Sequence, residues 1–248
     1  MLHRMKFMNT YIDNVTLAEA LDEIDTLIAA KSDAFVVTPN VDHIVQLEKG
    51  GVLAEVYDQA DLILCDGKPL VWISRLYGTP IKEKISGSDF FPELCKMASE
   101  KGYRVFFLGA AEGVAAKAAD ILKRRFKDLQ IVGVYSPPPY GFEKDMGETH
   151  HIIKMIKEAA PDILILGLGT PKQEKFILDH RHDYSVPISF GLGASFDFTA
   201  GNVKRAPKWM ADHGLEWLFR ITQDPKRMIK RYLIDDLKIV SLVFKYKN

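Results

Sequence analysis

The hydrophobic residues of this chain fall into short runs that alternate with longer amphipathic stretches. Short apolar runs bounded by turn residues are typical of buried parallel strands. Such runs lie at residues 34–38, 62–65, 104–109, 130–135, 162–169 and 186–191. Because helical patterns separate the runs, the chain is predicted to form an α/β fold, with a mainly parallel sheet covered on both faces.

Helical spacing of apolar residues is clear between Thr16 and Ala30. Thr16 is predicted to cap this helix, with Glu19 completing a capping box. The proline-rich stretch at 136–141 predicts a loop. Further helices are predicted at about 113–126, 148–159 and 173–181.

The composition changes at Gly201, which divides the chain into a predicted domain, residues 1–200, and an appendage, residues 201–248. Two helices are predicted in the appendage, at 204–217 and 225–247. At 100° per residue, one face of the second helix is apolar, a basic face lies roughly opposite, and Asp236 falls on the apolar side. The apolar residues are Ile229, Leu233, Leu237, Val240 and Phe244, and the basic ones are Arg227, Arg231, Lys238 and Lys245.

Two interpretations of this second helix are equally good on sequence alone. It could pack its apolar face on the domain and leave a solvated basic face. It could instead lie at the surface of an anionic membrane. The charge distribution bears on this choice, because residues 201–248 carry a net charge of +6 and residues 1–200 carry −6. Such a basic segment suggests an anionic partner, either a membrane surface or phosphates.

An apolar fraction of 47% and a charged fraction of 27% are ordinary for a soluble globular protein. Cys65 and Cys95 lie in apolar surroundings and are expected to be buried, reduced side chains. We find neither a signal peptide nor an apolar run of membrane-spanning length. The protein is therefore expected in the cytoplasm.

Asp66 directly follows the apolar run 62–65, and Gly67 and Pro69 come next. In open α/β sheets the carboxyl ends of the strands form the edge where ligands bind. Asp66 could cap the following helix by accepting a backbone N–H, with Pro69 in the first turn. It could also direct its carboxylate into a cleft as a general base. Capping is the commoner role for a single aspartate at such a position.

Other predicted strands also end in residues able to hold a phosphate or a sugar. Glycines at strand-to-helix turns let a ligand approach the backbone, and helix N-termini favour anions. Together these strand ends favour a nucleotide site. They carry Thr38 and Asn40, Gly109, Gly167 and Gly169, and Gly191 and Gly193.

A dinucleotide site is disfavoured, because Gly167-Leu-Gly169 and Gly191-Leu-Gly193 lack the third glycine of the G-x-G-x-x-G fingerprint. The chain also lacks a Walker A sequence and an Asp-x-Asp motif for a divalent ion. His43 is expected on a helix flank and not on a metal. If a diphosphate leaves here, basic side chains must stabilise its charge. Lys84, Arg205 and the arginines of the appendage are available.

Several longer motifs occur in a fixed order along nearly the whole chain. They are Thr38-Pro-Asn40, Asp66-Gly67 followed by Val71-Trp72, Ser86-Gly-Ser-Asp89, Gly167-Leu-Gly-Thr-Pro-Lys-Gln-Glu174, Gly193-Ala-Ser-Phe-Asp-Phe-Thr-Ala-Gly201, Arg205-Ala-Pro-Lys-Trp-Met210 and Gly214-Leu-Glu-Trp-Leu-Phe-Arg220. Together they resemble the WecG/TagA/CpsF family, glycosyltransferase family 26. The resemblance implies a Rossmann-like α/β/α domain with a helical C-terminal appendage that closes over the active site at the membrane.

The same resemblance implies an inverting, metal-independent enzyme that needs no cofactor. It would move a sugar from a UDP-sugar to a polyprenyl-diphosphate-linked saccharide at the cytoplasmic membrane face, in the synthesis of teichoic acid or another surface polysaccharide. N-acetylmannosamine is the commonest donor sugar, with its uronic acid or a hexose as alternatives. No nucleic-acid partner is expected, and a homo-oligomer is left open.

Carried over by position, the resemblance makes Asp66 the general base, with Thr38 and Asn40 in the same pocket and Gln173 against substrate. Asp197 and the glycines at 109, 167, 169, 191 and 193 would hold the nucleotide. The diphosphates would meet basic side chains, namely Lys84, Arg205, Arg220, Arg227 and Arg231.

This sequence departs from the family in three places. Lys84 stands where many members have arginine, which keeps the charge and loses the bidentate fork. Lys230 precedes Arg231 where an Arg-Arg pair is common, and Lys68-Pro69 after Asp66-Gly67 leaves the donor and acceptor preference open. Two other functions remain as alternatives, a Rossmann-type oxidoreductase and a non-catalytic nucleotide-binding module recruited to membranes.

Overall fold

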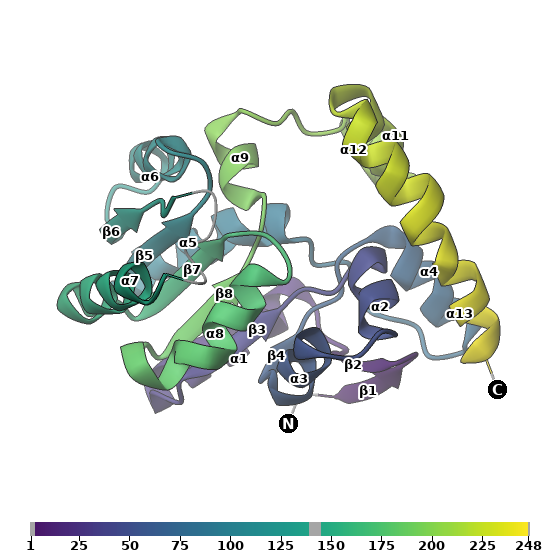
Figure 1. The fold of residues 1–248 in the computed structure, drawn as a ribbon, viewed down its shortest axis with the longest axis horizontal. Coiled ribbons are helices and arrows are strands. Elements are labelled where there is room, and N and C mark those ends of the chain that lie inside the picture. The colour runs from purple at the N-terminus through teal and green to yellow at the C-terminus, as the bar shows by residue number, and fades with distance from the viewer. Residues whose placement is uncertain (1–2, 139–144, 248) are drawn as a thin grey trace.

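The computed structural model describes residues 3–138 and 145–247, and its centre is a six-stranded parallel sheet (Figure 1). The strand order is β4-β3-β8-β7-β5-β6. The bounds are β3 (Ala34–Val37), β4 (Leu62–Ile63), β5 (Arg104–Gly109), β6 (Gln130–Tyr135), β7 (Ile163–Gly167) and β8 (Ile188–Gly191). A separate antiparallel pair consists of β1 (Arg4–Phe7) and β2 (Thr10–Asp13).

Helices follow almost every strand. Those of the first 200 residues are α1 (Leu17–Ala30), α2 (Val41–Leu47), α3 (Val52–Gln59), α4 (Lys68–Leu76), α5 (Gly87–Lys101), α6 (Val114–Arg125), α7 (Met146–Ala159), α8 (Lys172–Tyr184) and α9 (Ser195–Ala200). The capping box predicted for α1 is present, with Thr16 and Glu19 exchanging hydrogen bonds. The proline-rich loop expected at 136–141 falls partly in residues 139–144, which lie outside the described residues.

The sheet is buried on both faces, which explains why its strands are apolar at successive positions. In β3, Phe35 and Val37 belong to one core cluster, whereas Ala34 and Val36 belong to the cluster on the opposite face. Both cysteines are buried and free, as expected. The predicted α/β/α architecture is confirmed.

The helices after β5 and β7 leave the sheet on opposite faces. Leu122 of α6 packs in one core cluster and Ile177 of α8 in the other. The connection from β5 leads outward to β6, whereas that from β7 leads in the other direction to β8. The carboxyl ends of β5 and β7 therefore flank the point where the strand order reverses, where open sheets of this kind bind ligands.

The helix predicted at 204–217 is wrong. The structure forms two separate helices, α10 (Lys208–Asp212) and α11 (Glu216–Gln223), on either side of Gly214. Pro207 is in an extended conformation before α10. Gly214 has φ +72°, a left-handed conformation that ends a helix and that glycine adopts readily.

The helical run predicted from Pro225 is confirmed and continues to Lys245 (yellow in Figure 1). It is built from α12 (Pro225–Lys230), the π-turn η2 (Arg231–Asp235), the 3₁₀ turn η3 (Asp236–Lys238) and α13 (Ile239–Lys245). We call residues 225–245 the C-terminal run. None of the helices in the described parts of the chain has the length and apolar character needed to cross a membrane.

The apolar side of the C-terminal run faces outward. Its five apolar residues are between 44% and 69% exposed, from Ile229 to Phe244. The side that faces the protein carries Met228, Asp236 and Leu242, all buried. The interpretation in which the apolar face packs on the domain is therefore wrong.

The position of one charged residue in the run was also predicted wrongly. Asp236 is buried and not on the exposed apolar side, whereas Arg231 lies opposite that side, as predicted, and points inward to Asp236. A π-turn has more residues than a regular helical turn. A helical wheel drawn at a constant 100° per residue therefore gives wrong directions for the residues that follow Arg231–Asp235.

Candidate active site

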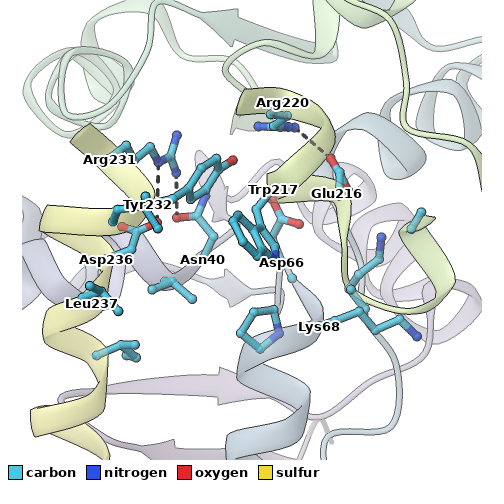
Figure 2. A pocket seen from close by; sticks show the side chains of 18 residues that line it. Asn40, Asp66, Lys68, Glu216, Trp217, Arg220, Arg231, Tyr232, Asp236 and Leu237 are labelled. Atoms are coloured by element: carbon cyan, nitrogen blue, oxygen red, sulfur yellow. Dashed lines mark hydrogen bonds and ion pairs between the residues drawn. The ribbon is translucent and has the colours of Figure 1, made fainter. Parts of the chain in front are cut away.

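A pocket of about 350 Å³ lies between the carboxyl edge of the sheet and the C-terminal helices (Figure 2). One wall comes from the turns after β3 and β4, and the opposite wall comes from α11 and the C-terminal run. The side chains labelled in Figure 2 are Asn40, Asp66, Lys68, Glu216, Trp217, Arg220, Arg231, Tyr232, Asp236 and Leu237.

Asp66 is positioned by its backbone. Its N–H donates to the Pro39 carbonyl at 2.8 Å, and the carbonyl of the preceding Cys65 accepts from Ile85 N–H at 2.8 Å. Gly67 then turns the chain with φ +110° into α4, whose first turn holds Pro69. Two short backbone bonds and this turn fix the place from which the carboxyl group enters the pocket.

Asp66 does not cap α4, so that interpretation is wrong. Gly67 occupies the N-cap position, and no side chain caps this helix. A capping contact would also have lowered the pKa of Asp66. Burial instead raises it to about 6, an effect that Lys84 and Arg220 oppose and Glu216 and Asp89 reinforce. A pKa near neutrality is the property that a general base needs.

Asn40 lines the pocket next to Asp66, at the N-cap of α2. Its Oδ1 accepts from His43 N–H at 3.3 Å and from Arg231 Nη2 at 3.4 Å. Thr38 is half-buried at the end of β3 and is not part of the pocket lining. The structure therefore brings Asn40 and Asp66 together and places Thr38 just outside the pocket.

Arg220 and Arg231 reach the pocket from two different helices (Figure 2). Arg220 pairs with Glu216 at 3.0 Å and lies over the Phe198 ring at 5.0 Å. Arg231 lies 3.6 Å from Asp42. Among the described residues, the buried Nε of each arginine has no hydrogen-bond partner. Because a buried donor without a partner is costly, both arginines offer unused donors to an anion.

Lys84 and Arg205 lie on either side of Asp89, at 3.2 and 2.6 Å. Both line a second pocket of about 620 Å³, which adjoins the first and shares Lys84 and Lys68 with it. Arg227 lies outside both pockets, with a side chain 76% exposed and paired with Asp224 at 2.8 Å. Three of the five predicted diphosphate-binding residues, Lys84, Arg220 and Arg231, thus line the pocket with Asp66, Arg205 lines the adjoining pocket, and Arg227 lines neither.

Three of the predicted nucleotide-binding glycines are required by packing. A Cβ on Gly109 would lie 2.7 Å from the Gly167 backbone, one on Gly167 would meet the Phe196 ring at 2.4 Å, and one on Gly191 would meet Gln173 at 2.8 Å. Gly169 and Gly193 differ, because both have positive φ and open space at the Cβ position. Only these two leave room for a ligand.

Gln173 and Asp197 lie outside both pockets. Gln173 is buried, and its side chain bonds to Glu174 and to the Gly193 N–H. Asp197 is half-buried in the first turn of α9, where burial raises its pKa.

A model of the glycosyl transferase WecG/TagA/CpsF family matches residues 5–248, nearly the whole chain. This chain belongs to that family. It is 36% identical over 223 residues to the N-acetylglucosaminyldiphosphoundecaprenol N-acetyl-beta-D-mannosaminyltransferase of Bacillus spizizenii, covering 90% of this chain and 83% of the relative. Proteins of the same name in Bacillus subtilis and Staphylococcus aureus strain MW2 are 33% identical over 243 residues (96% and 90% covered) and 29% identical over 227 residues (91% and 87% covered).

The pocket of this family member includes residues that the sequence analysis did not single out. Glu216 pairs with Arg220 one helical turn later, and an i, i+4 spacing of opposite charges is a readable signal. Tyr232 and Asp236 line the pocket from the π-turn and the turn after it. No sequence signal marks Tyr232, and Asp236 was marked only as a charged residue on the apolar side of the helix. The direction of Asp236 depends on the register change in the π-turn.

Proposed function

We propose that this chain is an inverting, metal-independent glycosyltransferase that uses a UDP-sugar as donor. The sugar would be of the N-acetylmannosamine type, and the acceptor a polyprenyl-diphosphate-linked N-acetylglucosamine. The name of the relatives supports this acceptor and this sugar, since they are N-acetylmannosaminyltransferases that act on N-acetylglucosaminyldiphosphoundecaprenol. Family membership gives no support to the oxidoreductase alternative.

The observation that carries the proposal is the Asp66 carboxyl group, which lies in the pocket without a hydrogen bond or ion pair to the described residues and with a pKa raised to about 6. Its carboxylate would accept the proton of the acceptor hydroxyl. The hydroxyl oxygen would then attack the anomeric carbon as the bond to UDP breaks and UDP leaves with the electron pair. A single displacement of this kind inverts the configuration at the anomeric carbon.

The leaving diphosphate needs positive charge and hydrogen-bond donors. Arg220 and Arg231 supply both, and their unpartnered Nε atoms would gain an acceptor. Charge-assisted bonds from arginine to phosphate are among the stronger hydrogen bonds in proteins. Lys84, which opposes the rise in the pKa of Asp66, adds a third charge beside the base.

The nucleotide would lie at the point where the strand order reverses, between β5 and β7. Asp66 follows β4, which is four strands away from β5 in the sheet. Four interstrand spacings correspond to about 19 Å. An extended nucleotide-sugar would therefore run along the carboxyl edge, past the open backbone of Gly169 and Gly193, toward Asp66.

The lipid part of the acceptor would enter from a membrane surface. Leu233 and Leu237 line the pocket and also belong to the exposed apolar face of the C-terminal run. Exposed apolar side chains on a basic helical segment are typical of interfacial binding to anionic lipid. We therefore propose that the protein binds peripherally to the cytoplasmic face of the plasma membrane, where its product would enter synthesis of a cell-surface polymer such as teichoic acid.

The test is a panel of UDP-sugars with a short-chain diphospholipid that carries N-acetylglucosamine. UDP release is measured with and without EDTA, and the anomeric configuration of the product is determined by NMR. We expect release with UDP-N-acetylmannosamine, inversion, and no loss of rate in EDTA. UDP binding without transfer from any donor would instead support a non-catalytic nucleotide-binding module.

A further inference from the structure

A buried chain of hydrogen bonds connects three neighbouring strand ends behind the Asp66 pocket. Asn40 follows β3, Gly193 follows β8, and Thr170 follows β7, and these strands are adjacent in the sheet. The side chains between them are His43, Gln173 and Glu174, which are 8%, 3% and 3% exposed.

The first branch of the chain runs from Asn40 to Glu174. His43 Nδ1 accepts from the Asn40 backbone N–H at 3.2 Å. His43 Nε2 lies 2.8 Å from Thr170 Oγ1, and that hydroxyl donates to Glu174 Oε1 at 2.9 Å. The second branch returns toward the sheet edge, with Gln173 Nε2 donating to the same Glu174 oxygen at 2.9 Å and Gly193 N–H donating to Gln173 Oε1 at 3.1 Å.

The partners of His43 assign one tautomer to its ring. Burial lowers the pKa of His43 to about 4, so the imidazole is neutral at neutral pH and carries one N–H. Nδ1 faces a backbone donor and must accept, which places the proton on Nε2. The Thr170 oxygen can accept a hydrogen bond from Nε2–H because the hydroxyl hydrogen of Thr170 is donated to Glu174. The other tautomer would set two donors against each other at Asn40.

Asn40 depends on this arrangement. Its backbone N–H and its Oδ1 are both held by His43, in a reciprocal capping box at the start of α2. With Oδ1 bonded to His43 N–H and Arg231, its Nδ2 has no hydrogen bond to the described residues and remains a donor beside the pocket.

We propose that Thr170 and Glu174 are positioning residues for glycosyl transfer, which hold His43 in the Nε2–H tautomer and thereby orient Asn40 toward the reacting sugar. The kinetic part of this inference rests on the proposed function. The tautomer part does not, because it can be measured without substrate.

The test uses Thr170→Val, which removes the hydroxyl and keeps the branched shape, and Thr170→Ser, which keeps the hydroxyl. Because small misplacement of a reacting group is costly, Thr170→Val should lower kcat by roughly 10- to 100-fold. KM for the UDP-sugar should stay within about twofold, since the proposed donor contacts at Gly169 and Gly193 are with the backbone and the substitution changes a side chain. Thr170→Ser should restore most of the rate.

The second readout is ¹⁵N NMR of the His43 ring in the full-length protein. We expect a single Nε2–H tautomer in the wild type and in Thr170→Ser, and a mixture in Thr170→Val. If Thr170→Val does not fold, Thr170→Ala repeats the test, because it also removes the hydroxyl and needs no added space.

Two results would overturn the inference. One is an unchanged His43 tautomer in Thr170→Val, and the other is a loss of kcat in Thr170→Ser as large as in Thr170→Val. A wild-type protein that transfers no sugar would contradict the proposed function instead, and the NMR comparison would then decide the positioning role of Thr170 alone.

Discussion

Two amphipathic helical segments of this chain bury opposite sides. Helix α1 packs Ala20, Ile24 and Ile28 into the core and turns its charged residues outward. The C-terminal run turns Arg231 and Asp236 inward, together with Met228 and Leu242, and leaves an outer face of five apolar residues exposed. Both segments show the same helical spacing in the sequence.

The difference follows from what each segment faces. Helix α1 lies on an apolar face of the sheet, where burial of aliphatic side chains is favourable. The C-terminal run faces the carboxyl edge, where Asn40, Asp42 and Asp66 present polar groups. An arginine side chain interacts favourably with these polar groups, whereas the exposed apolar residues of the run need a different, apolar environment. The membrane that we propose for the acceptor would provide it.

The largest expected effect is on catalysis, and it tests the role of Asp66, which lies opposite the inward side of the C-terminal run. Asp66→Asn removes the base and keeps the side-chain shape, so kcat should fall by ~10²–10⁴-fold, the usual contribution of a positioned base. UDP affinity, measured by calorimetry, should stay largely intact, because the nucleotide is proposed to bind several strands away. Full activity in this variant would show that Asp66 is not the base.

The pH dependence of the wild-type rate is a second test of Asp66 as the general base. The base must be ionised, and burial raises the pKa of Asp66 to about 6. We therefore expect kcat/KM to rise with pH up to about 6 and to level off above it. A rate that is flat between pH 5 and 8 would contradict this assignment.

The next effect compares two arginines of the C-terminal run. Arg231 lies in the pocket, whereas Arg227 is exposed outside it. Because hydrogen bonds to charged groups are worth ~1.5–3 kcal/mol, Arg231→Met should lower kcat/KM by roughly 10- to 100-fold. Arg227→Met is the matched control and should change kcat/KM by less than about twofold, in line with exposed ion pairs. Equal losses in both variants would mean that net charge, and not position, matters.

Substitutions in the exposed apolar face of the C-terminal run and in the buried apolar face of α1 should have opposite effects on vesicle binding and stability. Leu233→Ser with Leu237→Ser should weaken sedimentation with anionic vesicles and leave the melting temperature nearly unchanged, since both side chains are about half exposed. Ile24→Ala in α1 should do the reverse, costing about 2–5 kcal/mol of unfolding free energy with vesicle binding intact. Unchanged sedimentation of the double variant would rule out this part of the run as the membrane contact.

The fold was predictable because the sheet is buried on both faces. The run Arg104–Gly109 is apolar, almost fully buried and matches β5, and the run Gln130–Tyr135 matches β6 at the half-buried edge of the sheet. The helix at 204–217 could have been rejected from Pro207 and Gly214, whose backbone preferences interrupt it.

The strand pattern alone predicted site residues only where they follow directly from a strand, whereas Lys84, Arg220 and Arg231 were predicted from the family resemblance and also line the pocket. Asp66 and Asn40 lie at strand ends, and the parallel sheet brings them together. The position of Gln173 could not be predicted, because it is set by hydrogen bonds to Glu174 and to Gly193, which lie on different parts of the chain. Asp236 points inward because a π-turn precedes it. No sequence pattern predicted this π-turn.

The smallest expected effect concerns stability, and it contrasts the polar pocket with the core. The folded state raises the pKa of Asp66 from 3.8 to about 6, so it binds a proton more tightly than the unfolded state does. The stability that this proton provides is fully present below about pH 4 and is lost as pH rises through about 6. Ionised Asp66 therefore destabilises the protein at neutral pH.

Asp66→Asn removes this cost, so the variant should gain stability relative to the wild type as pH rises from 4 to 7. Two pKa units correspond to about 3 kcal/mol, and partial access of solvent to the carboxyl reduces the expected gain to roughly 1–3 kcal/mol. Urea unfolding at both pH values measures it, with Asp58→Asn on the exposed side of α3 as the control for loss of one carboxylate. A variant that is more stable and inactive would show that the pocket keeps a destabilising carboxylate for its chemistry. A variant with no gain at pH 7 would mean that the pocket solvates Asp66 well, and the raised pKa would then be wrong.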